Sequence, residues 1–313
     1  MVRKINQMSR PLLLVAMLLC SVASAQDHSI NSAIRDGDLK QVKTLLEGAN
    51  LNAQDGDGTT LLMYAVANAG ADCVKVLLDK GADPNLNNKA GATALMWAVN
   101  DLKKVQLLLD KGAHVNAVSK DEKSPLGLAL NLPNSLPVAQ ALLAKGANVN
   151  QADKRGFTPL MFAGFSGNLE LIQLLLAKGA DPKAKTKDGF NYLSAMANST
   201  NPAAVKWAVE QGLDVKDKKE TILIAPAMNG ALDIVQFLLT KGADANLPDE
   251  IGYTPLMHAV LTESSSLALV KLLLEHGADA KVKAKDGLTA LSFAKRKGWS
   301  EVVTFLTKAG AIE

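Results

Sequence analysis

The chain contains little of the chemistry on which enzymes and metal proteins depend. Only two of its 313 residues are cysteine, four are histidine and 4% are aromatic. The histidines, at positions 28, 114, 258 and 276, are scattered, and no pair of them has metal-ligand spacing. There is also no cysteine cluster, no glycine-rich phosphate loop after a strand, and no nucleophile beside a base and an orienting group. We therefore predict that the chain is not an enzyme and binds no metal and no cofactor.

The first 25 residues differ in character from the rest. Three basic residues precede an apolar run at 12–19, and Ala23 and Ala25 place small side chains directly before Gln26. This pattern is typical of a secretory signal peptide, and the run is shorter than the roughly 20 apolar residues that span a bilayer. We predict cleavage after the signal peptide, a mature domain of residues 26–313, no membrane insertion after cleavage, and a periplasmic or secreted location.

Removal of this segment leaves no excess of either charge. The full chain has 34 basic and 31 acidic residues, and its first 25 residues hold three of the basic ones and none of the acidic ones. The mature chain is therefore balanced, and nothing in its charge favours a nucleic acid or an anionic membrane surface as a partner. It also keeps one cysteine, Cys73, which excludes an intramolecular disulfide and which we interpret as an inert core residue.

What the chain does have is a short sequence motif, here called a phrase, that recurs about every 33 residues. It reads Gly-Ala-Asp or a close variant after a leucine-rich run, with its glycine at Gly48, Gly81, Gly112, Gly146, Gly179, Gly212, Gly242, Gly277 and Gly310. A second phrase, Thr-Pro-Leu or a relative, keeps the same step and begins at Thr60, Thr93, Ser124, Thr158, Asn191, Thr221, Thr254 and Thr289. Two signals in phase over almost the whole chain predict a solenoid, in which each unit is stable only on its neighbours.

The repeat that begins near Gly156 indicates what each unit folds into. Thr158 followed by Pro159 is a helix start, because the hydroxyl caps free N–H groups and proline fits the first turn. Gly167 ends this short first helix, and Gly179 ends a second helix whose leucine-rich face can pack on both neighbours. The polar stretch that follows is typical of a projecting hairpin.

This pattern resembles the ankyrin repeat, whose unit is a helix pair followed by an outward β-turn. The resemblance covers about Ser29 to the C-terminus and rests on Thr158-Pro159-Leu160, on Thr254-Pro255-Leu256 and on the closures at Gly81, Gly179, Gly242 and Gly277. The family usually has histidine after Thr-Pro-Leu, whereas this chain has methionine, so we expect apolar packing in place of a hydrogen bond between repeats. These methionines are Met63, Met96, Met161 and Met257.

The resemblance implies an all-α ankyrin-repeat solenoid of about nine helix-pair units with β-turn hairpin loops. The expected units are about 27–57, 58–90, 91–122, 123–155, 156–188, 189–219, 220–251, 252–286 and 287–313. The sixth unit is degenerate, with Asn191 at the start of its Thr-Pro-Leu position, and the hairpin after it is short and crowded with Lys216, Lys218 and Lys219. We therefore expect a bend or a weak joint near residues 191–226.

The hairpin tips are the first candidates for contact with a partner. Phe157, Phe190 and Tyr253 stand just before the Thr-Pro-Leu position, which in ankyrin-like proteins tends to project toward the concave side. Exposed aromatic side chains are frequent binding anchors. An aromatic ring at this place can instead fold over the next hairpin and stiffen it, and the sequence leaves both interpretations open.

A row of asparagines at the ends of the first helices is the second candidate. Its members are Asn68, Asn100, Asn131, Asn198 and Asn229, with Phe165 at the matching place in the fifth repeat and Asp101 beside Asn100. Asparagine tolerates a left-handed backbone, so a helix-ending role explains the row. The alternative is a neutral, hydrogen-bonding floor of the concave groove. In the ninth repeat this place becomes basic, with Lys295, Arg296 and Lys297, a kind of charge run that is usually solvated surface.

One position of the first helices is aromatic or histidine in several repeats. It holds Tyr64, Trp97, Phe162, His258 and Phe293. We interpret it as packing between adjacent first helices rather than as a binding stripe, because large apolar side chains are buried by default.

Taken together, the residues and the resemblance predict an exported bacterial member of this family that acts without catalysis and as a monomer. Its expected activity is to bind a protein partner along the concave groove, as an accessory or stabilising factor of an exported enzyme. The alternatives are an inhibitor or immunity protein that neutralises a toxic exported enzyme, and a secreted effector that binds host proteins. Elongated repeat surfaces suit protein binding, because many modest contacts add over a preorganised scaffold.

Overall fold

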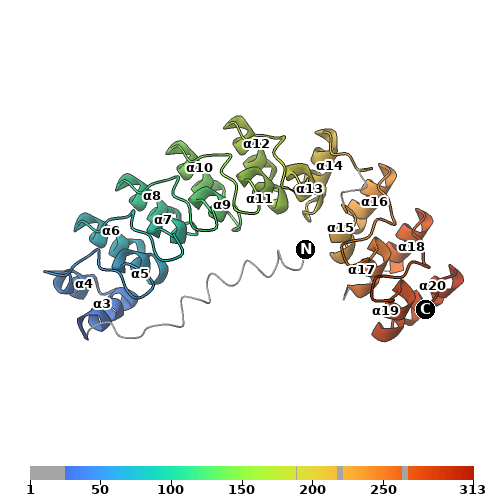
Figure 1. The fold of residues 1–313 in the computed structure, drawn as a ribbon, viewed down its shortest axis with the longest axis horizontal. Helices are drawn as coiled ribbons and strands as arrows, with labels where there is room; N and C mark the ends of the chain where they lie inside the picture. The colour runs from blue at the N-terminus through green and yellow to red at the C-terminus, as the bar shows by residue number, and fades with distance from the viewer. Residues whose placement is uncertain (1–24, 188, 217–220, 263–266) are drawn as a thin grey trace. The chain divides into compact units, whose positions relative to one another are not determined.

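The computed structural model describes residues 25–187, 189–216, 221–262 and 267–313. The predicted signal peptide, apart from Ala25, lies outside these residues, as do Lys218 and Lys219 of the crowded hairpin. Within the described part the secondary structure is helical, and extended pairing is limited to two isolated bridges, Gln54 with Thr60 and Asn87 with Thr93. The eighteen helices of this part follow one another as nine pairs (Figure 1), which confirms the predicted all-α repeat architecture.

The chain divides into two compact units, which we call the N-terminal unit and the C-terminal unit. Among the described residues the N-terminal unit comprises 25–162 and 171–187, and the C-terminal unit comprises 163–170 and the residues from 189 onward. The N-terminal unit contains α3 (Ala25–Asp36), α4 (Leu39–Leu45), α5 (Leu61–Asn68), α6 (Ala71–Asp79), α7 (Ala94–Trp97), α8 (Leu102–Asp110), α9 (Pro125–Ala129) and α10 (Leu136–Ala144). The boundary runs through α11 (Pro159–Ser166) and α12 (Leu169–Ala177). The C-terminal unit contains α13 (Tyr192–Ala197), α14 (Pro202–Glu210), α15 (Ile224–Met228), α16 (Leu232–Thr240), α17 (Pro255–Leu261), α18 (Leu267–Glu275), α19 (Ala290–Lys297) and α20 (Ser300–Lys308).

Most first helices begin at a hydroxyl residue that caps them. The side-chain oxygens of Thr60, Ser124 and Thr254 accept hydrogen bonds from the backbone N–H three residues later, over 3.2, 3.2 and 3.4 Å. The Thr289 hydroxyl oxygen likewise accepts from the Ser292 N–H over 3.1 Å. The Ser292 hydroxyl oxygen accepts from the Thr289 N–H over 2.9 Å, which completes a capping box. Each cap satisfies an N–H that the helix leaves unpaired. The Thr-Pro-Leu phrase therefore starts a helix, as the sequence predicts.

The second helices are followed by glycines with a left-handed backbone. Gly81 in the N-terminal unit and Gly242 in the C-terminal unit have φ angles of 97° and 93°, a region that glycine adopts without strain. The Gly-Ala-Asp phrase is therefore the closure of a helix pair, and its regular return sets the length of the repeat.

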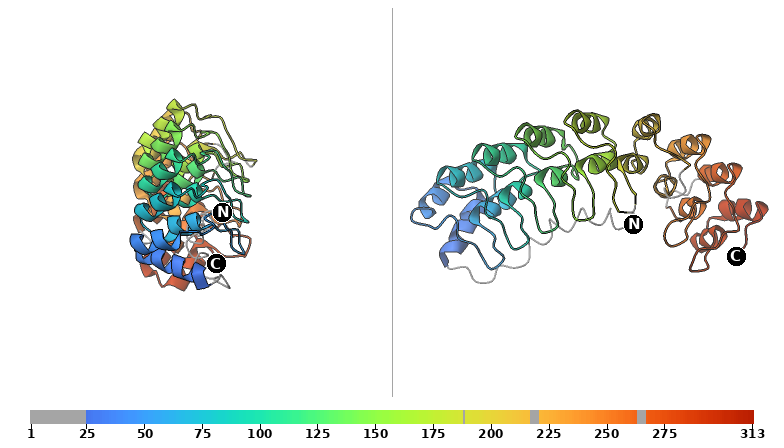
Figure 2. Two further views of the ribbon diagram at one scale, coloured as in Figure 1. Left: turned by 90° about the vertical axis from the view of Figure 1, so that its left-hand side faces the viewer. Right: turned by 45° about the horizontal axis from the view of Figure 1, so that its top comes forward.

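Within each unit the helices form two rows (Figures 1 and 2). In the N-terminal unit α3, α5, α7 and α9 contact one another in sequence, and so do α4, α6, α8 and α10. In the C-terminal unit the same holds for α15, α17 and α19 and for α14, α16, α18 and α20. We call these the first-helix row and the second-helix row of each unit. The methionines after Thr-Pro-Leu are buried in the first-helix rows, consistent with the expected apolar packing.

Ion pairs join neighbouring second helices of the N-terminal unit. The Asp79 carboxylate lies 2.6 Å from the ammonium of Lys75 and 2.8 Å from that of Lys111. A hydrogen bond from Lys111 and a weaker contribution from the hydrogen bond of Lys75 lower the pKa of Asp79 to about 2. Asp110 and Lys145 form the next pair, over 3.0 Å. All of these groups are largely exposed, so the pairs contribute less to stability than the buried core does.

Candidate functional site

The loops between successive helix pairs are held by their own side chains. Asp55, Asp153 and Asp249 each accept with Oδ1 from the N–H groups two and four residues later, and Asn88 makes the same pair of bonds, all over 2.8–3.0 Å. Ser119 does so with its hydroxyl oxygen over 3.3 Å. Two side-chain hydrogen bonds to the backbone therefore close each of these loops.

A ladder of five asparagines joins loops to the repeats that follow them, and our interpretation of the sequence missed it. Asn85, Asn116, Asn150 and Asn246 donate from Nδ2 to the carbonyl of the following closure glycine over 2.8–3.1 Å. Their Oδ1 atoms accept the N–H two residues beyond that glycine over 2.7–2.8 Å. Asn52 makes the second of these bonds, to Asp83. Each member of this asparagine ladder stands four residues after a closure glycine, and that spacing is the signal that could have identified it.

Lysine takes the ladder position in three loops, at Lys183, Lys216 and Lys281. The stem of Lys216 packs on the next closure, since a Cβ atom added to Gly242 would lie 2.8 Å from its Cε. Positions 183 and 216 bracket most of the segment that the sequence predicts to be a weak joint. At Lys216, within the C-terminal unit, no hydrogen bond of the asparagine-ladder kind to Gly242 or Asp244 is found among the described residues.

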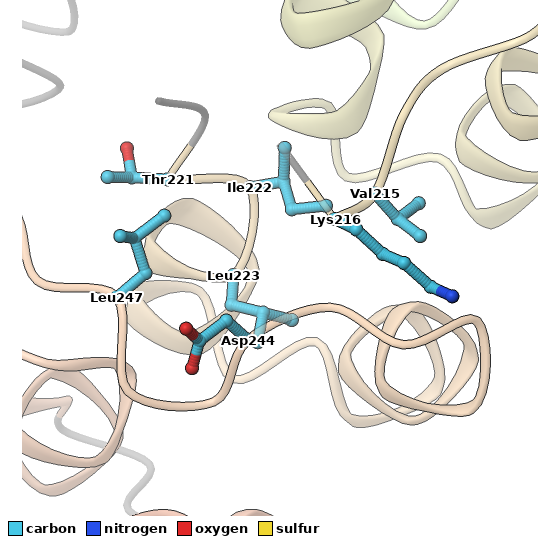
Figure 3. A pocket seen from close by; sticks show the side chains of 7 residues that line it. All are labelled: Val215, Lys216, Thr221, Ile222, Leu223, Asp244 and Leu247. Carbon is cyan, nitrogen blue, oxygen red and sulfur yellow. The ribbon is translucent and has the colours of Figure 1, made fainter. Parts of the chain in front are cut away.

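The loop at Lys216 contains a small cavity, shown in Figure 3. Its volume is about 10 Å³, and it is lined by Val215, Lys216, Thr221, Ile222, Leu223, Asp244 and Leu247. The Lys216 ammonium and the Asp244 carboxylate point in different directions in this view. A cavity of this size has room for about one water molecule and not for an organic ligand.

Phe157, the first hairpin-tip candidate, is buried. Its exposed fraction is 8%, its ring stacks on Phe162 with 5.9 Å between centroids, and the Arg155 guanidinium lies 4.8 Å from the ring centroid. Of the two interpretations that the sequence leaves open, the structure does not fit the projecting one for Phe157. The physical reason is that the ring has an apolar neighbour within its own unit and is covered by a cation. A role of Phe157 in binding stays a prediction.

Phe190 and Phe165, candidates from two different sets, lie together in the C-terminal unit. Their rings are stacked with centroids 5.5 Å apart and an interplanar angle of 19°. Both side chains are half-buried. An aromatic pair thus stands at the place where other repeats carry an exposed asparagine such as Asn68 or Asn229.

Tyr253, the third tip candidate, is half-buried against two other aromatic rings. Its centroid lies 5.7 Å from that of His258 and 5.2 Å from that of Phe293. Its phenol donates a 2.7 Å hydrogen bond to Asp286, and this bond is the main cause of the raised pKa of Tyr253. The buried His258 in turn lies 2.8 Å, through Nε2, from Oδ2 of Asp249, the residue that closes the loop. This small polar network ties the loop tip to the first helix behind it.

The asparagines of the second candidate set do not end their helices with a left-handed backbone. Asn198 and Asn229 have φ of −84° and −88°, and outside glycine the only positive φ values in the described residues are at Glu122 and Asn134. The helix-ending interpretation in its left-handed form is therefore wrong. Instead Asn68, Asn131 and Asn198 donate from Nδ2 to the carbonyl four residues earlier, over 2.9, 2.9 and 2.7 Å. The side chain adds one more bond to the helical ladder, so a right-handed end is satisfied without a turn.

The remaining members of this set differ in exposure. Asn68, Asn100 and Asn229 are exposed, and Asn198 is half-buried. Asp101 is half-buried and caps α8, accepting from the Lys104 N–H over 3.2 Å. The binding role proposed for these residues stays a prediction.

The aromatic position of the first helices is mixed in its environment. His258 and Phe293 are buried, with 8% and 6% exposed, whereas Tyr64, Trp97 and Phe162 are half-buried. Cys73 is buried, and burial, followed by the charge of Asp72, raises the pKa of its thiol. This environment agrees with its interpretation as a core residue.

The described residues contain neither a candidate metal centre nor a candidate membrane-spanning helix. No group of three or more histidine, cysteine, aspartate or glutamate side chains in that part of the chain is arranged to hold a metal ion. No helix in the same part has the length and apolar character needed to cross a membrane.

Comparison with known proteins gives one consistent result. A sequence model of ankyrin repeats, in three copies, matches residues 30–119, 100–186 and 192–284. Diacylglycerol kinase iota of Homo sapiens is 33% identical over 114 residues, and mitochondrial disaggregase of Bos taurus is 32% identical over 145. Ankyrin repeat, SAM and basic leucine zipper domain-containing protein 1 of Ornithorhynchus anatinus is 34% identical over 113. Each match covers 34% of this chain and 11%, 21% and 24% of the respective relative, so the chain spans only a minor part of each.

Proposed function

The chain belongs to the ankyrin repeat family, and from this premise we propose that it is exported and binds a protein partner with its loop tips and first-helix ends. Repeats of this family are protein interaction modules that are generally non-catalytic. The proposed role is that of an accessory or stabilising factor of an exported enzyme. Export follows from the pattern of the first 25 residues, with small side chains before Gln26.

The observation that carries the proposal is the Phe165–Phe190 pair. It is half-buried and stacked, and it stands at the first-helix end and at the adjoining loop. A Cβ atom added to the neighbouring Gly164 would lie 2.7 Å from the Tyr192 carbonyl oxygen, so the two backbones that carry the pair approach closely. Aromatic side chains held in one geometry lose little entropy on binding and dominate protein interfaces.

The test is a crosslinked capture from the exported fraction of the native cell, with the mature chain from Gln26 as bait. The variant F165A/F190A removes the aromatic pair. The control F237A/F305A removes two half-buried rings from the second-helix row, each of which has a lysine ammonium over its face. Circular dichroism confirms that both variants keep their helices.

We expect one stoichiometric partner, whose affinity falls by about tenfold or more in F165A/F190A and stays within about twofold in F237A/F305A. The proposed binding face would be refuted if both variants lost affinity equally or if no partner were captured. The activity of the captured partner with and without the bait then separates the roles. Higher or longer-lived activity supports the accessory role, and lost activity replaces it with the inhibitor or immunity role. If a partner is captured only from host material, the effector role replaces the accessory role.

A further inference from the structure

The end of the C-terminal unit carries two rows of exposed basic side chains. The first row is Lys281, Lys283 and Lys285, in the loop between α18 and α19. These lysines are exposed, whereas Val282 and Ala284 between them are half-buried and buried. The alternation leaves the three lysine side chains exposed on one side of the loop, where the Lys285 ammonium donates over 2.8 Å to the Glu250 carbonyl of the preceding loop.

The backbone under this first row is fixed. The Lys281 N–H donates to Oδ1 of Asp279 over 2.8 Å, and the Ala284 N–H donates to the Leu288 carbonyl over 2.9 Å. The Lys285 N–H reaches the Ile251 carbonyl of the preceding loop over 3.3 Å. Lysines on a preorganised backbone lose less entropy when a ligand orders them.

The second row is Lys295, Arg296 and Lys297, in the last turn of α19, and all three are exposed. Tyr253 links the two rows. Its phenol donates over 2.7 Å to Asp286, in the loop of the first row, and its ring centroid lies 5.2 Å from that of Phe293, in the helix that carries the second row.

Acidic side chains of the same segment cancel only part of this charge. Residues 277–313 contain seven basic and four acidic residues, although the mature chain as a whole is balanced. Of those acids, Asp286 accepts the Tyr253 phenol and Glu313 pairs with Lys295. The half-buried ring of Tyr253 adds an aromatic surface beside the two rows.

We propose that this basic end, made of Lys281, Lys283, Lys285, Lys295, Arg296 and Lys297, receives an acidic, extended segment of the protein partner. The inference rests on the proposed function and adds the chemistry of the partner to it. Carboxylates of such a segment meet the exposed cations of two rows, of which Lys295 also pairs with Glu313. Electrostatic complementarity of this kind fixes orientation and speeds association. A nucleic acid fits less well, because the rows hold one guanidinium and the mature chain has no net charge to attract a polyanion.

The experiment uses the full mature chain and a fluorescein-labelled peptide of alternating glutamate and serine. We expect saturable binding that weakens by about tenfold between low and physiological salt, since exposed charges are screened. The same peptide with glutamine in place of glutamate should not bind. The variant K281A/K283A/K285A should lower the affinity about tenfold or more, and R296A/K297A should act in the same direction.

The chain supplies a matched control in another loop. Lys183, Lys185 and Lys187 have the same alternating spacing and are exposed, and the Lys183 N–H is bound to Asp181 as the Lys281 N–H is bound to Asp279. The first helix that follows them ends in the neutral Asn198 rather than in basic residues. We expect K183A/K185A/K187A to keep the peptide affinity within about twofold of the parent chain.

Three results would overturn the inference. One is an equal loss in both triple variants, because binding would then depend on total charge. Another is no saturable binding at low salt. The third is tighter, variant-sensitive binding of duplex DNA or of vesicles rich in anionic lipid. If the acidic peptide does not bind but a partner is captured through Phe165 and Phe190, only the inference of an acidic segment is refuted. If the peptide binds but no partner is captured, the proposed function is refuted.

Discussion

The asparagine ladder makes a quantitative prediction at Lys216, one of the positions where lysine interrupts it. In the variant K216N the new side chain should take the place that Asn246 takes one repeat later. Asn246 donates to the Gly277 carbonyl over 2.8 Å and accepts from the Asp279 N–H over 2.7 Å. By the same register, an asparagine at 216 should donate to the Gly242 carbonyl and accept from the Asp244 N–H.

The expected gain follows from these two bonds. A typical intramolecular hydrogen bond contributes about 0.5–1.5 kcal/mol net, and the loop is solvent-exposed, so water competes for both groups. The loss of the Lys216 stem from its contact with Gly242 offsets part of the gain. We therefore expect K216N to be more stable than the parent chain by about 1 kcal/mol.

The assay compares K216N with K216A, which removes the lysine and adds no bond. Urea unfolding followed by circular dichroism gives the difference in free energy of unfolding. Repeat proteins can unfold in segments, so amide hydrogen exchange at Asp244 provides the local readout, and it should slow in K216N alone. If K216N and K216A have equal stability and equal exchange at Asp244, the ladder does not stabilise the stacking and the reasoning is refuted.

Two further predictions concern charge and close packing. The pKa of Asp79 is lowered from 3.8 to about 2, chiefly by Lys111, so its stabilising contribution is complete above the unfolded-state pKa and is lost as the pH falls through the folded one. The pH-dependent part of the difference in unfolding free energy between the parent chain and D79N should therefore be constant above about pH 5, shrink as the pH falls, and disappear below about pH 2. A difference that does not change with pH contradicts this. A Cβ atom at Gly164 would lie 2.7 Å from the Tyr192 carbonyl oxygen, so G164A should destabilise by about 1–3 kcal/mol in urea unfolding. Gly127, also helical, has no neighbour nearer than 3.4 Å, so G127A should be neutral or stabilising, and equal effects of both changes would show that backbone approach is not the cause.

The repeat architecture could be predicted from sequence because its signals are local. A threonine that caps a helix, as Thr254 does, acts within three residues of itself. A closure glycine such as Gly81 is required by a single backbone angle. Such signals need no knowledge of the neighbouring repeat, and their recurrence in phase makes each one more specific.

The contacts that define the candidate site depend on pairs of repeats, and those could not be predicted in the same way. Asn150 looks like ordinary loop composition until its bonds to Gly179 and Asp181 are seen. The burial of Phe157 depends on the position of Phe162, which is set by the helix that follows. Local chemistry allows Asn68 either a left-handed turn or a bond back to the Tyr64 carbonyl, and the structure adopts the second.

The asparagines of the ladder connect neighbouring repeats, whereas the asparagines at the first-helix ends are candidates for contact with a partner. A ladder asparagine such as Asn116 bonds to the next repeat, so changing it alters stability. A first-helix-end asparagine such as Asn131 bonds only within its own turn as far as its described contacts go, so the scaffold tolerates other residues there. That tolerance explains why this place can become aromatic at Phe165 and basic at Arg296. Local departures from a repeat pattern that cost little stability are where function is expected. We therefore expect substitutions at the first-helix ends to change affinity without changing stability, and substitutions in the asparagine ladder to do the reverse.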